Sequence, residues 1–463
     1  MGFNLTPTHP LPGASQALAP CAEGEGNRYA LCVIPPPSRG RPGGRWSNSR
    51  RGEGNISSRM KQIRFATGIL TFSRQKGGAE RYVADLCARM AREGYEVHVY
   101  SEQWDEEEEG SKIIFHRIRA FSFPKSLRLL SFALRATREM EAGGYDILFG
   151  VGNTLRANIL QPHGGVHWAW FWRSLNAYGH PLHWMVKFLG RVFSPKQWAS
   201  GWIENAPYRM KTLPRFIAIS DMVNQDMMRW YRIPEEQITV IYNGVDTERF
   251  HPRNRQFREE VRARHGLRDE LVILFVSNNF RMKGLDYLLQ ALAEIKQESR
   301  PAVKLLVLGR DRKKPYLRMA RKLGVSEEVI FAGATNDPEK YYGAADLLVH
   351  PTFYDACSLT VLEGLASGLP VITSLSNGAS GVIVHGEEGW LLDNPRNVEE
   401  LKRGIRYFFE EDLRNRVACQ GRRKAEGYSE RANFDRMMQL FEETLKNSRR
   451  MVQRVTNQSN IIR

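Results

Sequence analysis

Short apolar runs alternate with helical stretches along most of the chain, and the alternation occurs in two separate series. The runs of the first series are Ile63–Leu70, Glu96–Tyr100, Ile113–Ile118, Asp146–Val151 and Phe216–Ser220. Those of the second series are Val272–Ser277, Lys304–Leu308, Val329–Phe331, Leu347–His350 and Val371–Ser374. Apolar runs of this length predict buried parallel strands, and the helices between them predict doubly wound sheets. The sequence therefore predicts an α/β protein with two Rossmann-like domains.

The boundary between the two domains is expected where the strand that begins at Ile238 ends in Asn243-Gly244, a pair typical of turns. The first 59 residues are rich in Pro, Gly, Ser and Arg and show no sustained period. We expect a disordered leader there, or a mis-assigned start with Met60 as the true first residue. The predicted division is a leader at 1–59, an N-terminal domain at 60–243, a C-terminal domain at 244–428, a helix at 429–447 and a frayed tail at 448–463.

The formal net charge of +16 on 463 residues indicates an anionic partner. Nucleic acid, an anionic membrane surface and phosphate-bearing substrates are the three classes of such partners. Because the basic residues are spread along the chain and form no recognisable nucleic-acid-binding module, we expect no nucleic acid partner. The apolar runs are too short to cross a membrane, and the five cysteines lack disulfide or metal-ligand spacing, which fits a reducing cytoplasm.

The loop after the strand Leu347–His350 carries two candidate carboxylates. It leads into a helix expected at Ser358–Ala366, whose unpaired backbone N–H groups would form an anion site. Asp355 lies on the loop, and Glu363 lies within an apolar stretch of the helix. A polyhydroxylated ligand would give Glu363 hydrogen-bond partners. Alternatively, Glu363 caps a neighbouring strand edge or pairs with a basic residue.

A second loop of the same domain, Asn278–Gly284, follows the strand Val272–Ser277. It places Arg281 and Lys283 at the carboxyl end of that strand, where ligands of doubly wound sheets bind. Two cations at this position predict a phosphate site.

Two glycine pairs mark candidate contacts in the first domain. Gly77 and Gly78 lie between the first strand and its helix, where a phosphate or sugar could approach the backbone; an ordinary tight turn is the alternative. Gly164 and Gly165 follow His163 at the end of a strand, which makes His163 a candidate ligand or catalytic contact. A purely structural histidine is the alternative there.

The segment 161–208 contains six of the ten tryptophans. Within it, apolar residues recur with helical spacing at Met185, Phe188, Leu189, Val192 and Phe193, while Lys187 and Arg191 lie off that stripe. An aromatic, basic and amphipathic helix predicts association with an anionic membrane surface. The alternative is a helical hairpin whose aromatic side chains pack on the domain core.

From about Lys61 to Lys446 the chain resembles the retaining glycosyltransferases of family 4, which have the GT-B fold, and the likeness is greatest to the lipopolysaccharide core heptose glucosyltransferases. The resemblance implies two Rossmann-like domains facing across a cleft, with a C-terminal helix that crosses back to the first domain. The residues that carry it are Gly77-Gly78-Ala79-Glu80-Arg81, Tyr242-Asn243-Gly244-Val245-Asp246 with Arg249-Phe250, Lys283-Gly284, Asp355 with Glu363, Ala345–Pro351 and Gly364–Val371.

The family pattern implies roles for residues that would hold the nucleotide and the sugar. Glu363 would hold the ribose hydroxyls of the nucleotide. Asp355 would contact the donor sugar, together with the backbone N–H groups of Ser358, Leu359 and Thr360. The family usually has Glu at the position of Asp355, so the pattern leaves the donor sugar open.

The same pattern implies roles around the diphosphate. Lys283 and Arg281 would neutralise the diphosphate and stabilise the departing nucleotide. Gly77 and Gly78 would approach the diphosphate from the first domain, and His163 would contact the donor sugar.

The resemblance thus implies a retaining, metal-independent hexosyltransferase whose donor substrate is a nucleotide sugar, with UDP-glucose expected, and which needs no other cofactor. The expected acceptor is a lipopolysaccharide-core or lipid-linked glycan, and the expected location is the cytoplasmic face of the inner membrane, with peripheral attachment through 161–208. Another nucleotide-sugar enzyme of the same fold, an epimerase, a phosphorylase or a transferase to a soluble acceptor, is the alternative.

Overall fold

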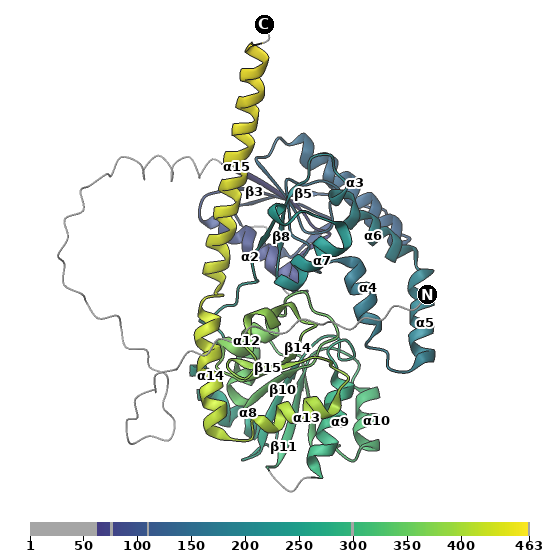
Figure 1. Ribbon diagram of the computed structural model, residues 1–463, viewed down its shortest axis with the longest axis vertical. Coiled ribbons are helices and arrows are strands. Elements are labelled where there is room, and N and C mark those ends of the chain that lie inside the picture. The colour runs from purple at the N-terminus through teal and green to yellow at the C-terminus, as the bar shows by residue number, and fades with distance from the viewer. Residues whose placement is uncertain (1–62, 75–76, 109–110, 298–300, 462–463) are drawn as a thin grey trace, which may run out of the picture. The chain divides into compact units, whose positions relative to one another are not determined.

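A computed structural model of the chain describes residues 63–74, 77–108, 111–297 and 301–461. The expected leader, 1–59, lies outside these residues. Within them the chain forms two parallel sheets of seven and six strands, each covered by helices, and a small two-stranded sheet of β2 (Thr71–Phe72) and β4 (Gln103–Trp104). Figure 1 shows the two large sheets, the first in purple to teal and the second in teal to green. The predicted fold class, two Rossmann-like domains, is confirmed.

The first domain is built on a seven-stranded sheet whose neighbours pair in parallel. Its strand order is β5 (Ile113–Arg117), β3 (Glu96–Ser101), β1 (Arg64–Gly68), β6 (Ile147–Gly150), β7 (Ile159–Leu160), β8 (Arg215–Ala218) and β9 (Ile238–Val240). Its helices are α2 (Gly78–Arg92), α3 (Lys125–Ala142), α4 (His167–Leu175), α5 (Pro181–Val192), α6 (Pro195–Tyr208) and α7 (Asp221–Tyr231).

The second domain has a six-stranded parallel sheet. Its strand order is β12 (Val329–Gly333), β11 (Val303–Leu308), β10 (Leu271–Val276), β13 (Leu347–His350), β14 (Val371–Ser374) and β15 (Gly389–Leu392). Its helices are α8 (Arg258–Arg264), α9 (Leu285–Lys296), α10 (Lys314–Lys322), α11 (Pro338–Ala344), α12 (Leu359–Ala366), α13 (Val398–Tyr407) and α14 (Glu411–Glu426).

The central strand β10 shows why these strands are apolar throughout. Its side chains alternate between two hydrophobic cores: Ile273 and Phe275 belong to one, and Val272 and Leu274 belong to the other. All four are fully buried. Because successive side chains of a strand point to opposite faces, a sheet covered by helices on both faces needs apolar residues at every position.

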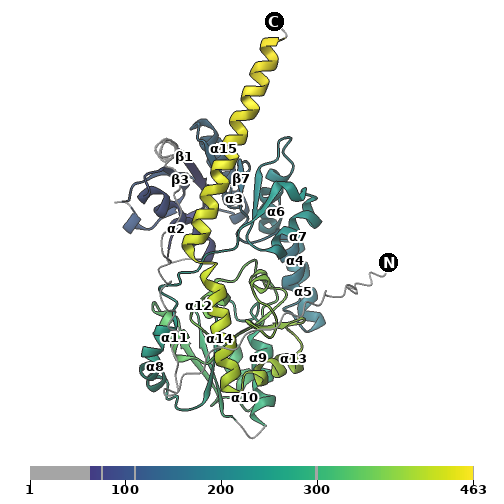
Figure 2. The ribbon, with the colours of Figure 1, turned by 60° about the vertical axis from the view of Figure 1, so that its left-hand side comes forward.

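The last helix, α15 (Glu430–Ile461), returns to the first domain. Phe441 of this helix lies against Phe65 of β1, with 5.8 Å between ring centroids, and Met437 is fully buried in the same core. Figures 1 and 2 both draw α15 beside α2 and β3. We expected a frayed tail from 448 onward, but the helix continues to Ile461 because nothing between Lys446 and that residue is a Gly or Pro that would end it.

Candidate active site

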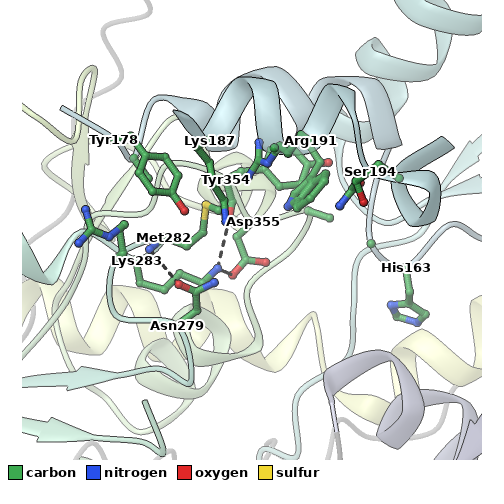
Figure 3. Close-up of a pocket in the computed structure, with 17 residues that line it drawn as sticks. His163, Tyr178, Lys187, Arg191, Ser194, Asn279, Met282, Lys283, Tyr354 and Asp355 are labelled. Atoms are coloured by element: carbon green, nitrogen blue, oxygen red, sulfur yellow. Dashed lines mark hydrogen bonds and ion pairs between the residues drawn. The ribbon is translucent and has the colours of Figure 1, made fainter. Parts of the chain in front are cut away.

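A cavity of about 630 Å³ is lined by residues of both domains. Four of the residues predicted from the sequence line it: His163, Arg281, Lys283 and Asp355. Figure 3 shows that Lys283 and Asp355 approach each other in this cavity. The other lining residues are Gly164, Trp170, Ala177, Tyr178, Lys187, Gly190, Arg191, Ser194, Gln197, Asn279, Met282, Tyr354 and Ala356.

Two loops of the second domain contact each other closely, and this contact positions Lys283 beside Asp355. Gly284, which precedes α9, has a φ of +78°, and a Cβ there would overlap the carbonyl oxygen of Pro351. Only glycine permits both this left-handed backbone and this close approach without strain. The amide of Phe353 donates to Met282 O at 2.9 Å, which holds the second loop against the first.

Asp355 is held in its ionised form. The Lys283 ammonium donates to Asp355 Oδ2, and also to Tyr354 O at 3.3 Å. His350 Nε2 lies 3.7 Å from the same carboxylate oxygen. Burial raises the pKa of Asp355, but the charge of Lys283 and the bond with His350 outweigh burial and hold that pKa well below its usual range. Lys283 and Asp355 therefore form a charged pair at neutral pH.

Arg281 contacts a tyrosine of the first domain. Its guanidinium lies 5.4 Å from the ring centroid of Tyr178, in the turn between α4 and α5. The ammonium of Lys187, on α5, lies 5.7 Å from the same ring. Both are cation–π distances, so Tyr178 contacts one cation from each domain. Arg281 also lies 3.9 Å from the carboxylate of Asp286.

His163 lines the cavity, but its ring lies apart from Lys283. The ring packs edge-on against Tyr82 of α2, with 4.1 Å between centroids, and Figure 3 draws it directed away from the Lys283–Asp355 pair. The side chain is 9% exposed, and burial lowers its pKa to about 3, so it is neutral. Among the described residues, none hydrogen-bonds to its Nε2.

The glycines after His163 have different surroundings. We predicted that something approaches the backbone there. At Gly165, where φ is +74°, the approaching group is the Tyr354 hydroxyl of the second domain. At Gly164 a Cβ would meet nothing within 4 Å, and this residue lines the cavity.

Glu363 does not line the cavity. Its Oε2 accepts a hydrogen bond from the Tyr342 hydroxyl at 2.8 Å. Burial raises the pKa of Glu363, although Tyr342 and the charges of Arg81 and Arg249 act in the opposite direction. The partner of Glu363 is thus a tyrosine hydroxyl, rather than the strand edge or basic residue considered as alternatives.

The remaining predicted residues lie at two helix starts. Ser358 is the N-cap of α12, and Leu359 and Thr360 form its first turn, while Gly77 is the N-cap of α2. A Cβ on Gly78 would lie 4.0 Å from Leu359 Cδ1, so the two helix starts approach each other. None of these five residues lines the cavity of about 630 Å³.

Arg191 and Lys187 were expected on the surface, as membrane-binding charges; this is wrong for Arg191, which is buried, whereas Lys187 is exposed. Arg191 is 6% exposed, and its Nη1 donates to Phe171 O and to Ser174 Oγ, both at 2.8 Å. Lys187 lines the cavity. An apolar face of α5 is exposed as well, while Lys187 and Arg191 line the cavity from this helix (Figure 3).

Tyr178 and Tyr354 were not identified from the sequence. Tyr354 directly precedes Asp355, which could have drawn attention to it, whereas nothing in the sequence around Tyr178 distinguishes it. Within the described part of the chain, no group of three or more His, Cys, Asp or Glu could hold a metal ion, and no helix is long and apolar enough to span a membrane.

Comparisons with known proteins agree with the fold. Residues 76–249 match the model of Glycosyltransferase Family 4, and residues 257–424 match that of Glycosyl transferases group 1. The lipopolysaccharide glucosyltransferase WaaG of Escherichia coli is 23% identical over 343 residues, which are 71% of this chain and 85% of WaaG. A D-inositol 3-phosphate glycosyltransferase of Thermomonospora curvata is 25% identical over 79% of this chain and 90% of its own.

Solved structures share the architecture. The crystal structure of WaaG has a TM-score of 0.68 at 21% identity and covers 81% of this chain and 99% of its own. Anabaena HepE, solved in complex with UDP-glucose, has a TM-score of 0.60 at 18% identity, with coverage of 83% and 99%. Since the two family models match consecutive domains and together span most of the chain, the protein belongs to the family 4 and group 1 glycosyltransferases of GT-B fold.

Proposed function

We propose that this glycosyltransferase moves glucose from UDP-glucose to a lipopolysaccharide-core or lipid-linked glycan acceptor at a membrane surface, with retention of anomeric configuration and without a metal ion. The observation that carries the proposal is the charged pair of Lys283 and Asp355 in a cavity to which both domains contribute. WaaG is named as a lipopolysaccharide glucosyltransferase, which supports the proposed sugar and acceptor. The structure of HepE with UDP-glucose supports the proposed donor.

In this proposal the second domain holds the donor. Lys283 and Arg281 neutralise the diphosphate, which in other enzymes is often the task of a metal ion. Asp355, already oriented by Lys283, accepts hydrogen bonds from sugar hydroxyls. Glu363 takes the ribose hydroxyls, and the amides of Leu359 and Thr360 contact the sugar at the positive end of α12, whereas the Ser358 amide already donates to Asn377 Oδ1 at 3.2 Å. Gly77, Gly78 and His163 complete the site from the first domain.

The proposed chemistry is a front-side displacement. The acceptor hydroxyl oxygen forms a bond to the anomeric carbon while the bond from that carbon to the diphosphate oxygen breaks. The hydroxyl proton passes to the departing phosphate oxygen, and no covalent bond to the protein forms. Because negative charge grows on the leaving diphosphate, preformed cations beside it stabilise the transition state more than the ground state.

The outer face of α5 supports the membrane part of the proposal. Leu182, Met185, Val186 and Leu189 are between 44% and 63% exposed, and Phe193, which follows the helix, is 78% exposed. Trp172 and Trp198, on the neighbouring helices, are about half exposed. An apolar helix face with aromatic neighbours is suited to lie at the boundary of headgroups and acyl chains. The attraction rests mainly on this apolar face, since Arg191 is buried and the exposed Lys187 lines the cavity.

The experiment that tests the donor site combines binding and turnover. UDP-glucose should protect the protein against thermal unfolding more than GDP or ADP sugars do. Lys283→Met should reduce kcat for transfer about 100-fold or more, the effect of removing one preorganised charge contact. Lys322→Met removes a charge from the exposed end of α10 and serves as the control. Full transfer activity in Lys283→Met would refute the site, and NMR of the product reports the anomeric configuration.

A further inference from the structure

Four cationic side chains line the cavity: Arg281 and Lys283 from the second domain, and Lys187 and Arg191 from α5. Among the described lining residues, Asp355 is the one carboxylate, and His163 is neutral. The diphosphate of a nucleotide sugar carries about one negative charge on each phosphate. Once such a donor is bound, it and Asp355 supply about three negative charges against the four cations, so about one positive charge stays unbalanced.

Within the part of the chain that the structure describes, neither Lys187 nor Arg191 forms an ion pair with a carboxylate. Arg191 packs against Trp170, with 4.7 Å from its guanidinium carbon to the ring centroid, and it uses Nη1 for its bonds to Phe171 and Ser174. A guanidinium has five N–H donors, so others remain for a ligand. Arg191 is buried, and a buried cation without a counter-ion is costly, which indicates an anion beside it in the working complex. Lys187 is exposed and lines the same cavity, so it can share that anion.

The position of these cations points to the acceptor rather than to the donor. Figure 3 draws Lys187 and Arg191 across the cavity from Lys283 and Asp355. Ser194 and Gln197, which follow α5, also line the cavity and add polar groups. The opposite face of α5 is the exposed apolar one, so an acceptor anchored in a membrane under that face would place its polar headgroup near the two cations.

We propose that Lys187 and Arg191 form a subsite for a phosphate group on the acceptor, which makes the acceptor class a phosphorylated glycan. This rests on the proposed function. Phosphate suits the subsite because its several oxygens can accept from an ammonium and a guanidinium at once. Tyr178 acts as a positioning residue, since its ring contacts both Lys187 and the donor-side Arg281.

The test uses an inner-core lipopolysaccharide oligosaccharide as acceptor, either intact or after hydrogen fluoride has removed its phosphates. The wild-type protein should prefer the phosphorylated form about tenfold in kcat/KM, the worth of one charge-assisted hydrogen bond. Lys187→Met should raise the acceptor KM about tenfold and abolish the preference, with little change in the donor KM. Lys187→Arg should restore the preference. Lys196→Met, at an exposed position outside the cavity, is the matched control.

Two outcomes overturn the subsite. One is a preference for the phosphorylated acceptor that survives in Lys187→Met. The other is a donor KM that rises in Lys187→Met as much as the acceptor KM does, which would assign the cations to the donor. Absence of transfer by the wild-type protein to both acceptors would count against the proposed function instead. In that case, calorimetry with inorganic phosphate tests whether the subsite exists. The wild-type protein should bind inorganic phosphate at least fivefold more tightly than Lys187→Met and Arg191→Lys, and equal binding refutes the subsite.

Discussion

Gly165 of the first domain fits against the Tyr354 hydroxyl so closely that a Cβ on Gly165 would overlap the hydroxyl oxygen. Tyr354 is 4% exposed, and among the described residues its hydroxyl has no hydrogen-bond partner. The neighbouring Gly164 and Asp355 both line the cavity. The contact therefore joins the two domains beside the candidate active site.

Gly165→Ala is expected to lower the free energy of unfolding by about 2 kcal/mol or more. Part of this loss, about 1 kcal/mol, comes from the left-handed backbone at φ +74°, and the rest comes from the overlap with Tyr354. Tyr354→Phe removes the unpartnered hydroxyl and should be close to neutral by itself. In the Tyr354→Phe background, Gly165→Ala should therefore cost less. Urea unfolding of the four proteins measures this coupling, and equal costs in both backgrounds would contradict it.

Asp355→Asn is expected to tighten the binding of UDP while it slows sugar transfer. The carboxylate neutralises Lys283 and repels an incoming diphosphate, so its removal frees the cation for the nucleotide. Transfer should fall because the sugar loses a charged acceptor for its hydroxyls. The variant should also lose about 1–3 kcal/mol of stability, since Lys283 is left partly buried without its partner. Calorimetry with UDP and initial rates separate the two effects.

The outcome for Asp355→Asn that would contradict the proposal is weaker binding of UDP together with unchanged transfer. Asp269→Asn provides a control in the same domain. Asp269 is exposed and does not line the cavity. Its replacement should leave the ratio of UDP affinity to transfer rate unchanged.

The strands could be predicted because strands that are buried on both faces consist of apolar residues. β13 and β14 have the limits expected from the sequence, Leu347–His350 and Val371–Ser374, since a strand buried on both faces must be apolar throughout. In contrast, β15 (Gly389–Leu392) was not predicted. Its short Gly-Trp-Leu-Leu segment resembles many other apolar stretches and becomes a strand only through pairing with β14.

The site residues that could be predicted are the cations and the carboxylate that follow directly after a strand. Positions that depend on how helices and loops pack against one another could not be predicted. The loop positions of Lys283 and Asp355 placed both at the same sheet edge, and they meet there. The periodicity of α5 identified an apolar face but not its direction, so Arg191 was assigned to the wrong side. Similarly, the glycines after His163 indicated a close neighbour without revealing that it is Tyr354.

Met185→Ser combined with Leu189→Ser is expected to weaken binding to phospholipid vesicles. Both side chains belong to the outer face of α5 and are 54% and 44% exposed, so the fold should tolerate the change. Loss of their contact with acyl chains should reduce affinity about 30-fold, or about 2 kcal/mol. Cosedimentation with vesicles measures this. Leu375→Ser, on a residue 51% exposed in the second domain, is the matched control, and an equal loss there would contradict a role for α5.

Glu204 is expected to make stability depend on pH near neutrality. This residue of α6 accepts hydrogen bonds from the His167 amide at 2.7 Å and from the Tyr231 hydroxyl at 2.9 Å, and burial raises its pKa to about 7. Because the folded state holds the proton more tightly than the unfolded state, the contribution to stability is fully present below the ordinary Glu pKa of about 4.5. It is lost as the pH rises through about 7, when the buried carboxyl ionises.

Glu204→Gln removes this titration while keeping the shape of the side chain. The free energy of unfolding of the wild-type protein relative to the variant should therefore fall by about 1–3 kcal/mol between pH 5 and pH 8. Urea unfolding at pH 5, 6, 7 and 8 measures the difference. Glu235→Gln, the same substitution at an exposed position, shows the effect of losing one surface charge. A difference between wild type and Glu204→Gln that stays constant, or grows in favour of the wild type as the pH rises, would mean that Glu204 is already ionised at pH 5 and that its burial is compensated by its two donors.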